Sequence, residues 1–270
     1  MKKFLLSFLF HRRMKLKGLF KKKRHQIQLI KLSRVAAAQI DFRVFKNVKD
    51  FYKQILNIAK KAKESGAEFV CFPQGMDLEL RPLPMKDMNV AQRERIFEVY
   101  SSVFKDVAWQ EGIYIAESKI KQGKIESTVW TPSGRKLNGN VIEIGGKKMH
   151  FSEFDSDFGE EVEDDVHLYV FPRFGYTPKK SGEISKAWLA SQQNYVFSIE
   201  SRLVGRYFNT KLNGKTGIYA PLEMTKFQDG VLAISNTMDK EEVIVADLDF
   251  ESLERLISFN EYEAYDRLLL

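Results

Sequence analysis

The alternation of apolar and polar positions predicts a strand–helix–strand unit near the start of the chain. Residues 34–40 form a short apolar run, which is typical of a buried strand. Residues 47–65 then repeat apolar side chains at helical spacing, with Gly66 as a stop signal. Residues 68–73 form a second apolar strand that ends at a proline. Because a helix joins the two strands, we expect them to pair in parallel, which places the chain in the α/β class.

The same patterns continue to residue 270 without a repeat or a low-complexity linker. We therefore expect residues 33–270 to form one domain, in which many strands suit two sheets packed face to face and covered by helices. Helices are predicted over residues 90–111 and 182–192 and from Asp249 or Glu251 onward. Strands are predicted over residues 113–118, 124–131, 141–144, 148–154, 167–172, 195–201, 216–220, 231–235 and 242–248.

Charge is distributed very unevenly along the chain. The formal net charge is +7, and residues 1–34 carry twelve Lys or Arg side chains and no acid, so the remaining residues carry a net charge of −5. Residues 1–32 are therefore predicted to be a basic arm on a mildly acidic body. The apolar share of 44% is high enough for a sizeable core and excludes the intrinsically disordered class.

The arm begins with an apolar run, Phe4 to Phe10, which is too short to span a bilayer and lacks a small-residue cleavage site. Aromatic and aliphatic side chains beside the cations favour contact with an anionic membrane surface. A solvated tail is the alternative, and a nucleic-acid contact is the least favoured of the three. Met14 is an alternative start that would remove the apolar run. The membrane-contact candidates are Phe4, Leu5, Phe8, Phe10, Arg12, Arg13, Lys21, Lys22 and Lys23.

Cysteine and histidine usage argues against a disulfide, a metal site or a cofactor. Cys71 is the single cysteine, and it lies inside an apolar strand where a small buried hydrophobe is the expected role. The four histidines lie far apart and show no metal-ligand spacing. The acids that follow Glu160 lack the Asp-x-Asp-x-Asp-Gly pattern of a calcium loop.

A series of short motifs occurs in one order between residues 33 and 255. The first motif is the strand–helix–strand unit, which has Asn47 before its helix and Gly66-Ala67 before its second strand, and which ends in Phe72-Pro73-Gln74. Four further motifs follow in order: Thr131-Pro-Ser-Gly134, Asp155 with Phe158 and Glu160, Gln192-Gln-Asn-Tyr-Val196, and residues 241–249. In this order they resemble the nitrilase superfamily of carbon–nitrogen hydrolases. The resemblance implies a nitrilase-like α-β-β-α sandwich of two packed mixed sheets covered by helices.

The resemblance also implies where the catalytic Glu, Lys and Cys of active members would fall. The family's Phe-Pro-Glu corresponds to Phe72-Pro73-Gln74, so an amide stands in place of the general base. The family's Cys-Tyr-Asp-x-x-Phe-Pro-Glu lies over residues 153–160, so Glu153 stands in place of the nucleophile. We therefore expect a catalytically inactive relative.

The family lysine, which would stabilise the oxyanion, falls near Val141 or Ile142. Lys136, Lys147 and Lys148 are nearby but out of register. The segments on either side of Glu153 are shorter than in active members, which removes part of the pocket wall and leaves the usual family dimer contact in doubt.

Gln74, Glu153 and Asp155 form the candidate pocket, and two functions remain open for it. The first is a binding or scaffold protein for an unknown protein or small-molecule ligand, cytoplasmic, with the arm at the inner membrane surface. The second is a hydrolase acting on carbon–nitrogen bonds with non-standard residues, in which Glu153, Asp155 and Asp157 form a carboxylate cluster. Homo-oligomerisation stays open in both.

Overall fold

The first two strands and the helix between them form the parallel unit that the sequence predicts. The structure, a computed structural model, describes residues 32–81, 88–121, 124–152, 165–175 and 185–268. Strand β1 (Arg34–Phe42) pairs in parallel with β2 (Phe69–Gln74), and helix α2 (Val48–Glu64) joins them. The Asn47 side chain caps α2 by accepting the N–H of Asp50 at 2.9 Å.

The remaining elements follow the predicted order, with four short additions. Two 3-10 helices, η1 (Met76–Leu80) and η4 (Leu222–Met224), and two strands, β5 (Lys136–Asn138) and β10 (Thr210–Leu212), were not predicted. The others are α3 (Val90–Glu111), β3 (Tyr114–Lys121), β4 (Lys124–Trp130), β6 (Val141–Ile144), β7 (Lys147–Phe151), β8 (Val166–Phe174), α4 (Lys186–Asn194), β9 (Phe197–Tyr207), β11 (Gly217–Tyr219), β12 (Val231–Ile234), β13 (Glu242–Asp247) and α5 (Phe250–Leu268).

Six strands run in the same direction and therefore end at the same edge of the molecule. Strands β3, β2, β1, β9, β8 and β7 pair in parallel, each with the next. We call the edge where these strands end the carboxyl edge. Strand ends in parallel sheets are the usual place for functional side chains, because the loops that follow them are free to vary.

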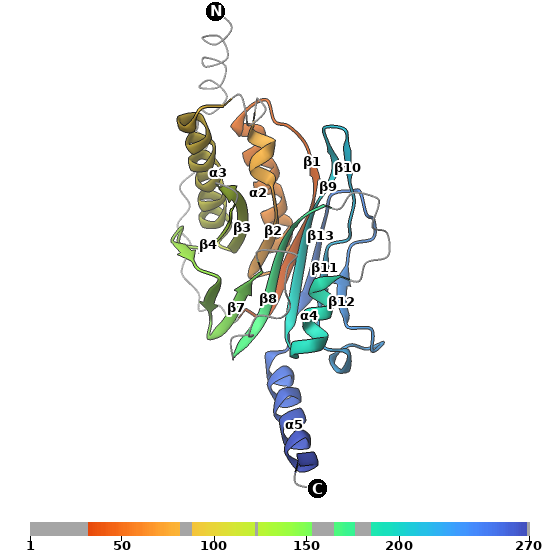
Figure 1. The fold of residues 1–270 in the computed structure, drawn as a ribbon. Coiled ribbons are helices and arrows are strands. Elements are labelled where there is room, and N and C mark those ends of the chain that lie inside the picture. The colour runs from red at the N-terminus through yellow and green to blue at the C-terminus, as the bar shows by residue number, and fades with distance from the viewer. Residues whose placement is uncertain (1–31, 82–87, 122–123, 153–164, 176–184, 269–270) are drawn as a thin grey trace, which may run out of the picture.

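The hydrogen-bonded strands curl into two facing layers, as Figure 1 shows. Among the described residues the strand order is β5-β4-β3-β2-β1-β9-β8-β7-β6, so the two predicted sheets are joined where β1 pairs with β9. The inner core between the layers contains side chains from both halves, including Cys71 of β2, Val170 of β8 and Ile199 of β9. Burial of these apolar faces against each other is the main force that closes the sandwich.

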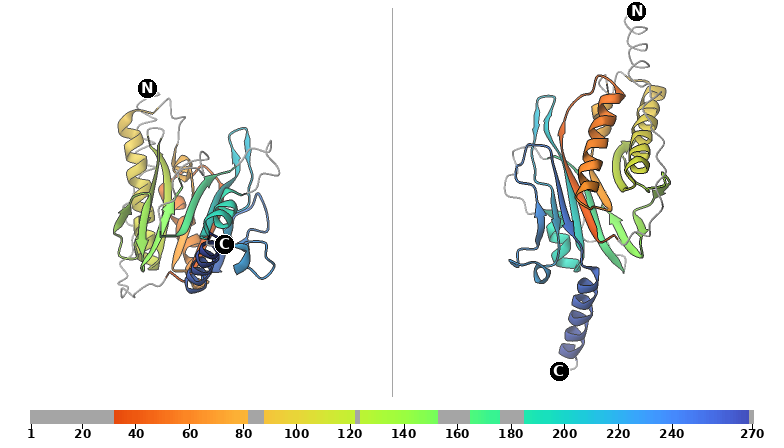
Figure 2. Two further views of the ribbon diagram at one scale, coloured as in Figure 1. Left: turned by 60° about the horizontal axis from the view of Figure 1, so that its bottom comes forward. Right: turned by 180° about the vertical axis from the view of Figure 1, so that it is seen from behind.

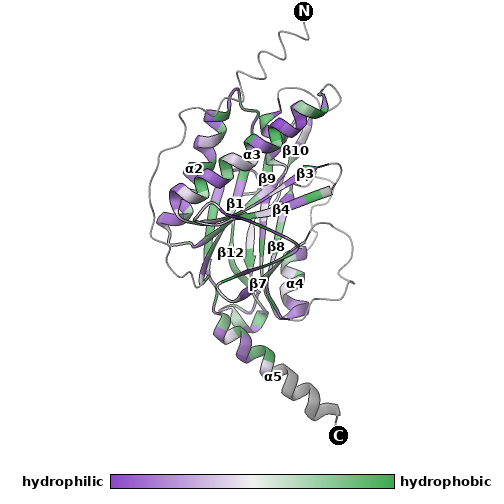
Figure 3. Ribbon diagram, turned by 90° about the vertical axis from the view of Figure 1, so that its left-hand side faces the viewer, coloured by the Kyte–Doolittle hydropathy of each residue, from purple (hydrophilic) through white to green (hydrophobic). Residues whose placement is uncertain are grey.

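Helices cover the two outer faces. Helices α2 and α3 lie side by side on the layer that contains β1 to β4, and α4 covers β8 and β9 on the opposite layer (Figure 2). The hydropathy colouring of α2 and α3 shows purple and green patches along each helix, consistent with one apolar and one polar face (Figure 3). The predicted α-β-β-α order of layers is therefore present.

Helix α5 leaves the body at the end opposite the carboxyl edge, and its distal part projects away from the sandwich (Figures 1 and 2). Its root is anchored by Phe250 and Leu253, which are buried in the inner core beside Leu248. The N–H of Leu248 donates to the carbonyl of Ser33 at 2.8 Å, so the start of the described chain lies beside the root of α5. No helix in the described part is long and apolar enough to cross a bilayer.

Candidate functional site

Gln74, the first candidate pocket residue, ends β2 at the carboxyl edge. Its Cα partner is Ser118 of β3, and Ser118 Oγ lies 2.9 Å from Ser127 Oγ of β4. A row of uncharged polar side chains therefore crosses three neighbouring strands at this edge. Amide and hydroxyl groups donate and accept hydrogen bonds, but none of them accepts a proton at neutral pH.

The residue after Gln74 lies directly against an aromatic ring. Gly75 has a φ of +87°, and a Cβ at this position would lie only 2.5 Å from Cδ2 of Phe174. Phe174 ends β8 in the opposite layer, and its ring stands edge-on to that of Tyr207 with the centroids 5.6 Å apart. A bulky apolar side chain therefore bridges the two layers beside Gln74.

The predicted lysine position is apolar, and the three nearby lysines lie away from the carboxyl edge. Val141 and Ile142 are the first two residues of β6. Lys136 is the Cα partner of Trp130, which pairs with Ile115 near the start of β3. Lys147 and Lys148 begin β7 and so lie at its opposite end. The structure brings none of these three lysines to the end of β2.

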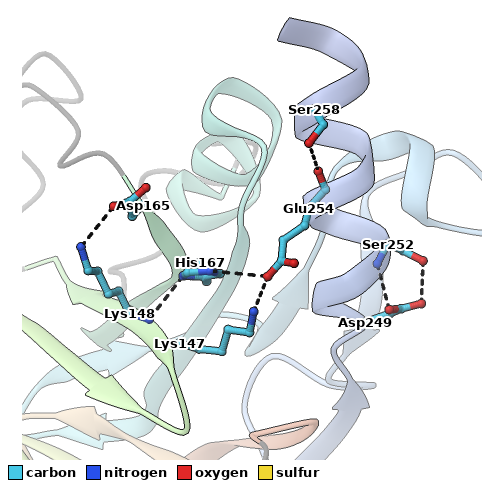
Figure 4. A network of polar contacts seen from close by, with 8 residues as sticks. All are labelled: Lys147, Lys148, Asp165, His167, Asp249, Ser252, Glu254 and Ser258. Atoms are coloured by element: carbon cyan, nitrogen blue, oxygen red, sulfur yellow. Dashed lines mark hydrogen bonds and ion pairs between the residues drawn. The ribbon is translucent and has the colours of Figure 1, made fainter. Parts of the chain in front are cut away.

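Lys147 and Lys148 instead belong to a polar network at the root of α5, shown in Figure 4. The ammonium of Lys147 donates to Glu254 of α5, and His167 Nε2 lies 3.9 Å from the same carboxylate. The N–H of Lys148 donates to His167 Nδ1 at 3.3 Å, and its ammonium lies 3.4 Å from Asp165. Burial lowers the pKa of His167, and the Lys147 charge adds to this effect. These contacts serve the attachment of α5 to the body.

Glu153 and Asp155, the other two candidate pocket residues, lie outside the described residues. Strand β7 ends at Phe151, and the N–H of Ser152 donates to the carbonyl of Val170 at 3.0 Å. The described chain thus reaches the carboxyl edge one residue before the predicted nucleophile position. The pocket of Gln74, Glu153 and Asp155 stays a prediction, as do the contacts of arm residues 1–31, which also lie outside the described part.

Cys71 is buried in the inner core, as the sequence predicts. Its side chain is 0% exposed, and its Sγ lies 3.1 Å from the Oγ of Ser201 on β9. Burial raises the pKa of the thiol to about 12, although the hydrogen bond with Ser201 opposes this shift. A thiol with this pKa, out of contact with solvent, is not a nucleophile at neutral pH.

A buried charged group on the other face of β3 was not anticipated from the sequence. Glu117 and Lys119 are both buried, with Lys119 Nζ 3.9 Å from Glu117 Oε1 and donating to Ser101 of α3 at 3.2 Å. Burial raises the pKa of Glu117 to about 7, against the opposing effect of Lys119. The sequence signal was a pair of opposite charges two residues apart within an otherwise apolar strand, which places both on one face.

The third member of this group lies on η1, immediately after Gln74 and Gly75. The carboxylate of Asp77 is fully buried and accepts a hydrogen bond from Arg81. Burial raises the pKa of Asp77, while Arg81 acts in the opposite direction. The group faces α3, so it supports the backbone behind Gln74 from the helix side of the sheet. Among the described residues, no set of three His, Cys, Asp or Glu side chains is placed to hold a metal ion.

Solved structures share this fold over most of the chain. A cysteine-to-serine mutant of the Nesterenkonia AN1 amidase from the nitrilase superfamily matches with a TM-score of 0.64 at 15% identity, over 86% of this chain and 98% of that one. A cysteine-to-alanine mutant of the Nesterenkonia sp. AN1 amidase in complex with butyramide gives 0.65 at 16% identity, over 83% and 94%. A glutamate-to-glutamine mutant of the same amidase carries the acetamide moiety of fluoroacetamide covalently at its active-site cysteine. It matches with a TM-score of 0.65 at 15% identity, over 85% of this chain and 95% of that one.

The sequence comparisons add nothing to this likeness. No protein-family model matches the chain. No curated protein matches it either. At 15–16% identity the structural likeness shows the fold, which is the nitrilase-superfamily sandwich that the motifs predicted.

Proposed function

We propose that this protein uses a carbon–nitrogen hydrolase-like fold for binding rather than for hydrolysis. The observation that carries the proposal is the end of β2, where Gln74 is followed by Gly75 and the ring of Phe174. A carboxylate base is missing where the resemblance places one, and an aromatic ring stands beside it. A general base within hydrogen-bond reach of the nucleophile is needed to activate it, and an amide cannot take that role.

The absence of a suitable nucleophile supports the same conclusion. Cys71 is the chain's only thiol, and it is enclosed between the two layers with a raised pKa. The motif alignment puts Glu153 at the nucleophile position, and a carboxylate is a weak nucleophile toward an unactivated amide. The ligand of such a scaffold would be an unidentified protein or small molecule that contacts the carboxyl edge.

Fluoroacetamide tests the proposal chemically. In the amidase mutant this reagent leaves its acetamide moiety on the active-site cysteine even though a glutamate has been replaced by glutamine. It therefore reports on a nucleophile without requiring every catalytic group. We expect intact-mass measurements of the folded protein to show no adduct after incubation with fluoroacetamide. An adduct that forms in the folded protein, and that maps to Cys71 or Glu153, would overturn the proposal.

The alternative is a hydrolase of non-standard chemistry that uses Glu153, Asp155 and Asp157. It predicts release of ammonia from amides or nitriles, and loss of that release in a Glu153→Ala variant. Glu163→Ala is the matched control, because Glu163 belongs to the same acidic stretch but lies outside the nucleophile motif. The binding proposal predicts no release above buffer for any of the three proteins.

We also propose that the basic arm, residues 1–32, contacts an anionic membrane surface. Twelve cations without an acid, beside Phe4, Phe8 and Phe10, support this contact. We expect the full chain to sediment with vesicles that contain phosphatidylserine, and to sediment less when Lys21, Lys22 and Lys23 are replaced by Gln. Retention on DNA or RNA with a steep salt dependence, without vesicle binding, would instead identify a nucleic-acid contact.

A further inference from the structure

The hairpin between β9 and β10 carries an unusual residue at its tip. Tyr207 of β9 pairs with Thr210 of β10, so Phe208 and Asn209 are the two turn residues. Phe208 has a φ of +51°, and its side chain is 70% exposed. In two-residue hairpins a first turn position with positive φ is normally filled by Gly, Asn or Asp. Phe208 therefore combines backbone strain with an exposed ring, and neither feature benefits the fold by itself.

The ring of Phe208 is held in place by an aromatic row. Its centroid lies 4.8 Å from that of Tyr207, which in turn lies 5.2 Å from Phe42 and 5.6 Å from Phe174. Phe42 and Phe174 are anchored on β1 and β8, so the row runs from the body to the tip. The contact with Tyr207 favours one orientation of the exposed Phe208 ring, which lowers part of the entropic cost of binding.

Two cations stand beside the tip. Arg206 and Lys211 are cross-strand partners next to the turn, and both are exposed. Three acids lie farther back or to the side: Asp239 is 3.8 Å from Lys211, and Asp41 and Glu241 both lie within 4 Å of Arg43. The tip itself presents an exposed ring with Arg206 and Lys211 beside it, which is the chemistry that an anionic bilayer interface attracts.

We propose that the β9–β10 hairpin is a second membrane contact, in which Phe208 enters the interfacial layer of an anionic bilayer and Arg206 and Lys211 meet the headgroups. This inference extends the membrane contact proposed for the arm. The hairpin lies at the carboxyl edge, whereas β1 begins at the opposite end of the body (Figure 1). The nine residues of β1 span about 30 Å, and the 31 preceding residues reach at most about 105 Å when extended. Both contacts therefore fit one membrane surface.

Site-specific fluorescence on the full chain tests the proposal. Because Cys71 is buried, a cysteine introduced at Asn209 takes up an environment-sensitive dye selectively. A cysteine at Gln228 is the matched control, because Gln228 also has a positive φ and follows Phe227, which is 77% exposed on another loop. With phosphatidylserine–phosphatidylcholine vesicles we expect a blue shift and quenching by brominated lipid at position 209 and no change at position 228.

A second pair of variants assigns the effect to the ring. Phe208→Ser should reduce the shift at position 209 at least twofold, and Phe227→Ser should leave it unchanged. If the protein sediments with vesicles but the dye at position 209 does not respond, the hairpin proposal is wrong and the arm proposal stands. If the full chain does not sediment with vesicles at all, both proposals are overturned.

Discussion

The ring of Phe174 lies on the backbone of Gly75, at a point where a Cβ would be 2.5 Å from Cδ2. This contact joins the ends of β8 and β2, which belong to opposite layers of the sandwich. Gly75 also follows Gln74, the residue that the motif resemblance predicts at the position of the catalytic base. The pair therefore links the packing of the carboxyl edge to the backbone of the candidate site.

Replacement of Gly75 by Ala should destabilise the protein for two separable reasons. The positive φ costs about 1–2 kcal/mol for an L-residue, and the overlap with Phe174 adds at least about 1 kcal/mol. Gly146→Ala isolates the first effect, because Gly146 has a φ of +78° and a methyl group at this position would have no atom within 4 Å. Urea unfolding measures how much more the free energy of unfolding falls in Gly75→Ala than in Gly146→Ala. A Phe174→Ala background should reduce the Gly75→Ala cost to that of Gly146→Ala, and an unchanged cost would contradict the contact.

Cys71 should resist alkylation in the folded protein. Its side chain is 0% exposed, so a reagent in solution cannot reach the sulfur. Burial also raises its pKa to about 12, so very little of the reactive thiolate is present at neutral pH. Iodoacetamide at pH 8 should modify it only at the rate of global unfolding, and should do so fully in urea. The measurement is intact mass against time. Rapid modification under native conditions would show that Cys71 reaches solvent.

Glu117 should make the protein less stable as the pH rises from about 4.5 to about 7. Its pKa is raised in the folded state, so the folded protein binds the proton more tightly than the unfolded chain does. The stabilisation is complete below pH 4.5 and is lost as the pH rises through 7. A shift of this size corresponds to about 3 kcal/mol.

A Glu117→Gln variant should therefore lose this part of the pH dependence. The matched control is Glu126→Gln, because Glu126 also faces Lys119 but its side chain is 47% exposed. The measurement is the free energy of unfolding between pH 4.5 and pH 8 for the three proteins. Parallel curves for wild type and Glu117→Gln would contradict the assigned protonation.

The root of α5 should depend on Phe250. This ring is buried, stands edge-on to Phe197 at 5.2 Å, and has Lys147 Nζ 5.2 Å from its centroid. Phe250→Ala should cost about 3 kcal/mol and increase hydrogen exchange throughout α5 before it affects α2. Phe259→Ala, on the same helix but 58% exposed, should change little. Equal exchange in both variants would show that α5 is anchored elsewhere.

The sequence was sufficient where local signals agree. Helix α3 begins at Val90 and ends at Glu111 as predicted, because its apolar spacing lies between an Asn89–Gln92 capping box and Gly112 in the left-handed conformation. Strand β1 was recognised because nearly all of it is buried and apolar. The layer order followed from the motif resemblance, and the structural likeness bears it out.

Other features depend on contacts between distant parts of the chain. Strand β5 has only three residues, and Lys136 and Asn138 in it are exposed, so it has no hydrophobic pattern to detect. The Phe174–Gly75 contact joins residues about 100 positions apart. Hydropathy also predicts that Glu117 and Lys119 are exposed, and their burial follows from the packing of α3 against β3. Glu153, by contrast, rests on the motif alignment alone.

Turnover tests the central claim most directly. The full chain should be incubated with a panel of aliphatic and aromatic amides and nitriles, and ammonia release should be measured against buffer and against the Glu153→Ala variant. The account predicts no release above buffer from either protein, since Gln74 supplies no base and Cys71 no accessible thiolate. Release that wild type shows and Glu153→Ala abolishes would contradict it.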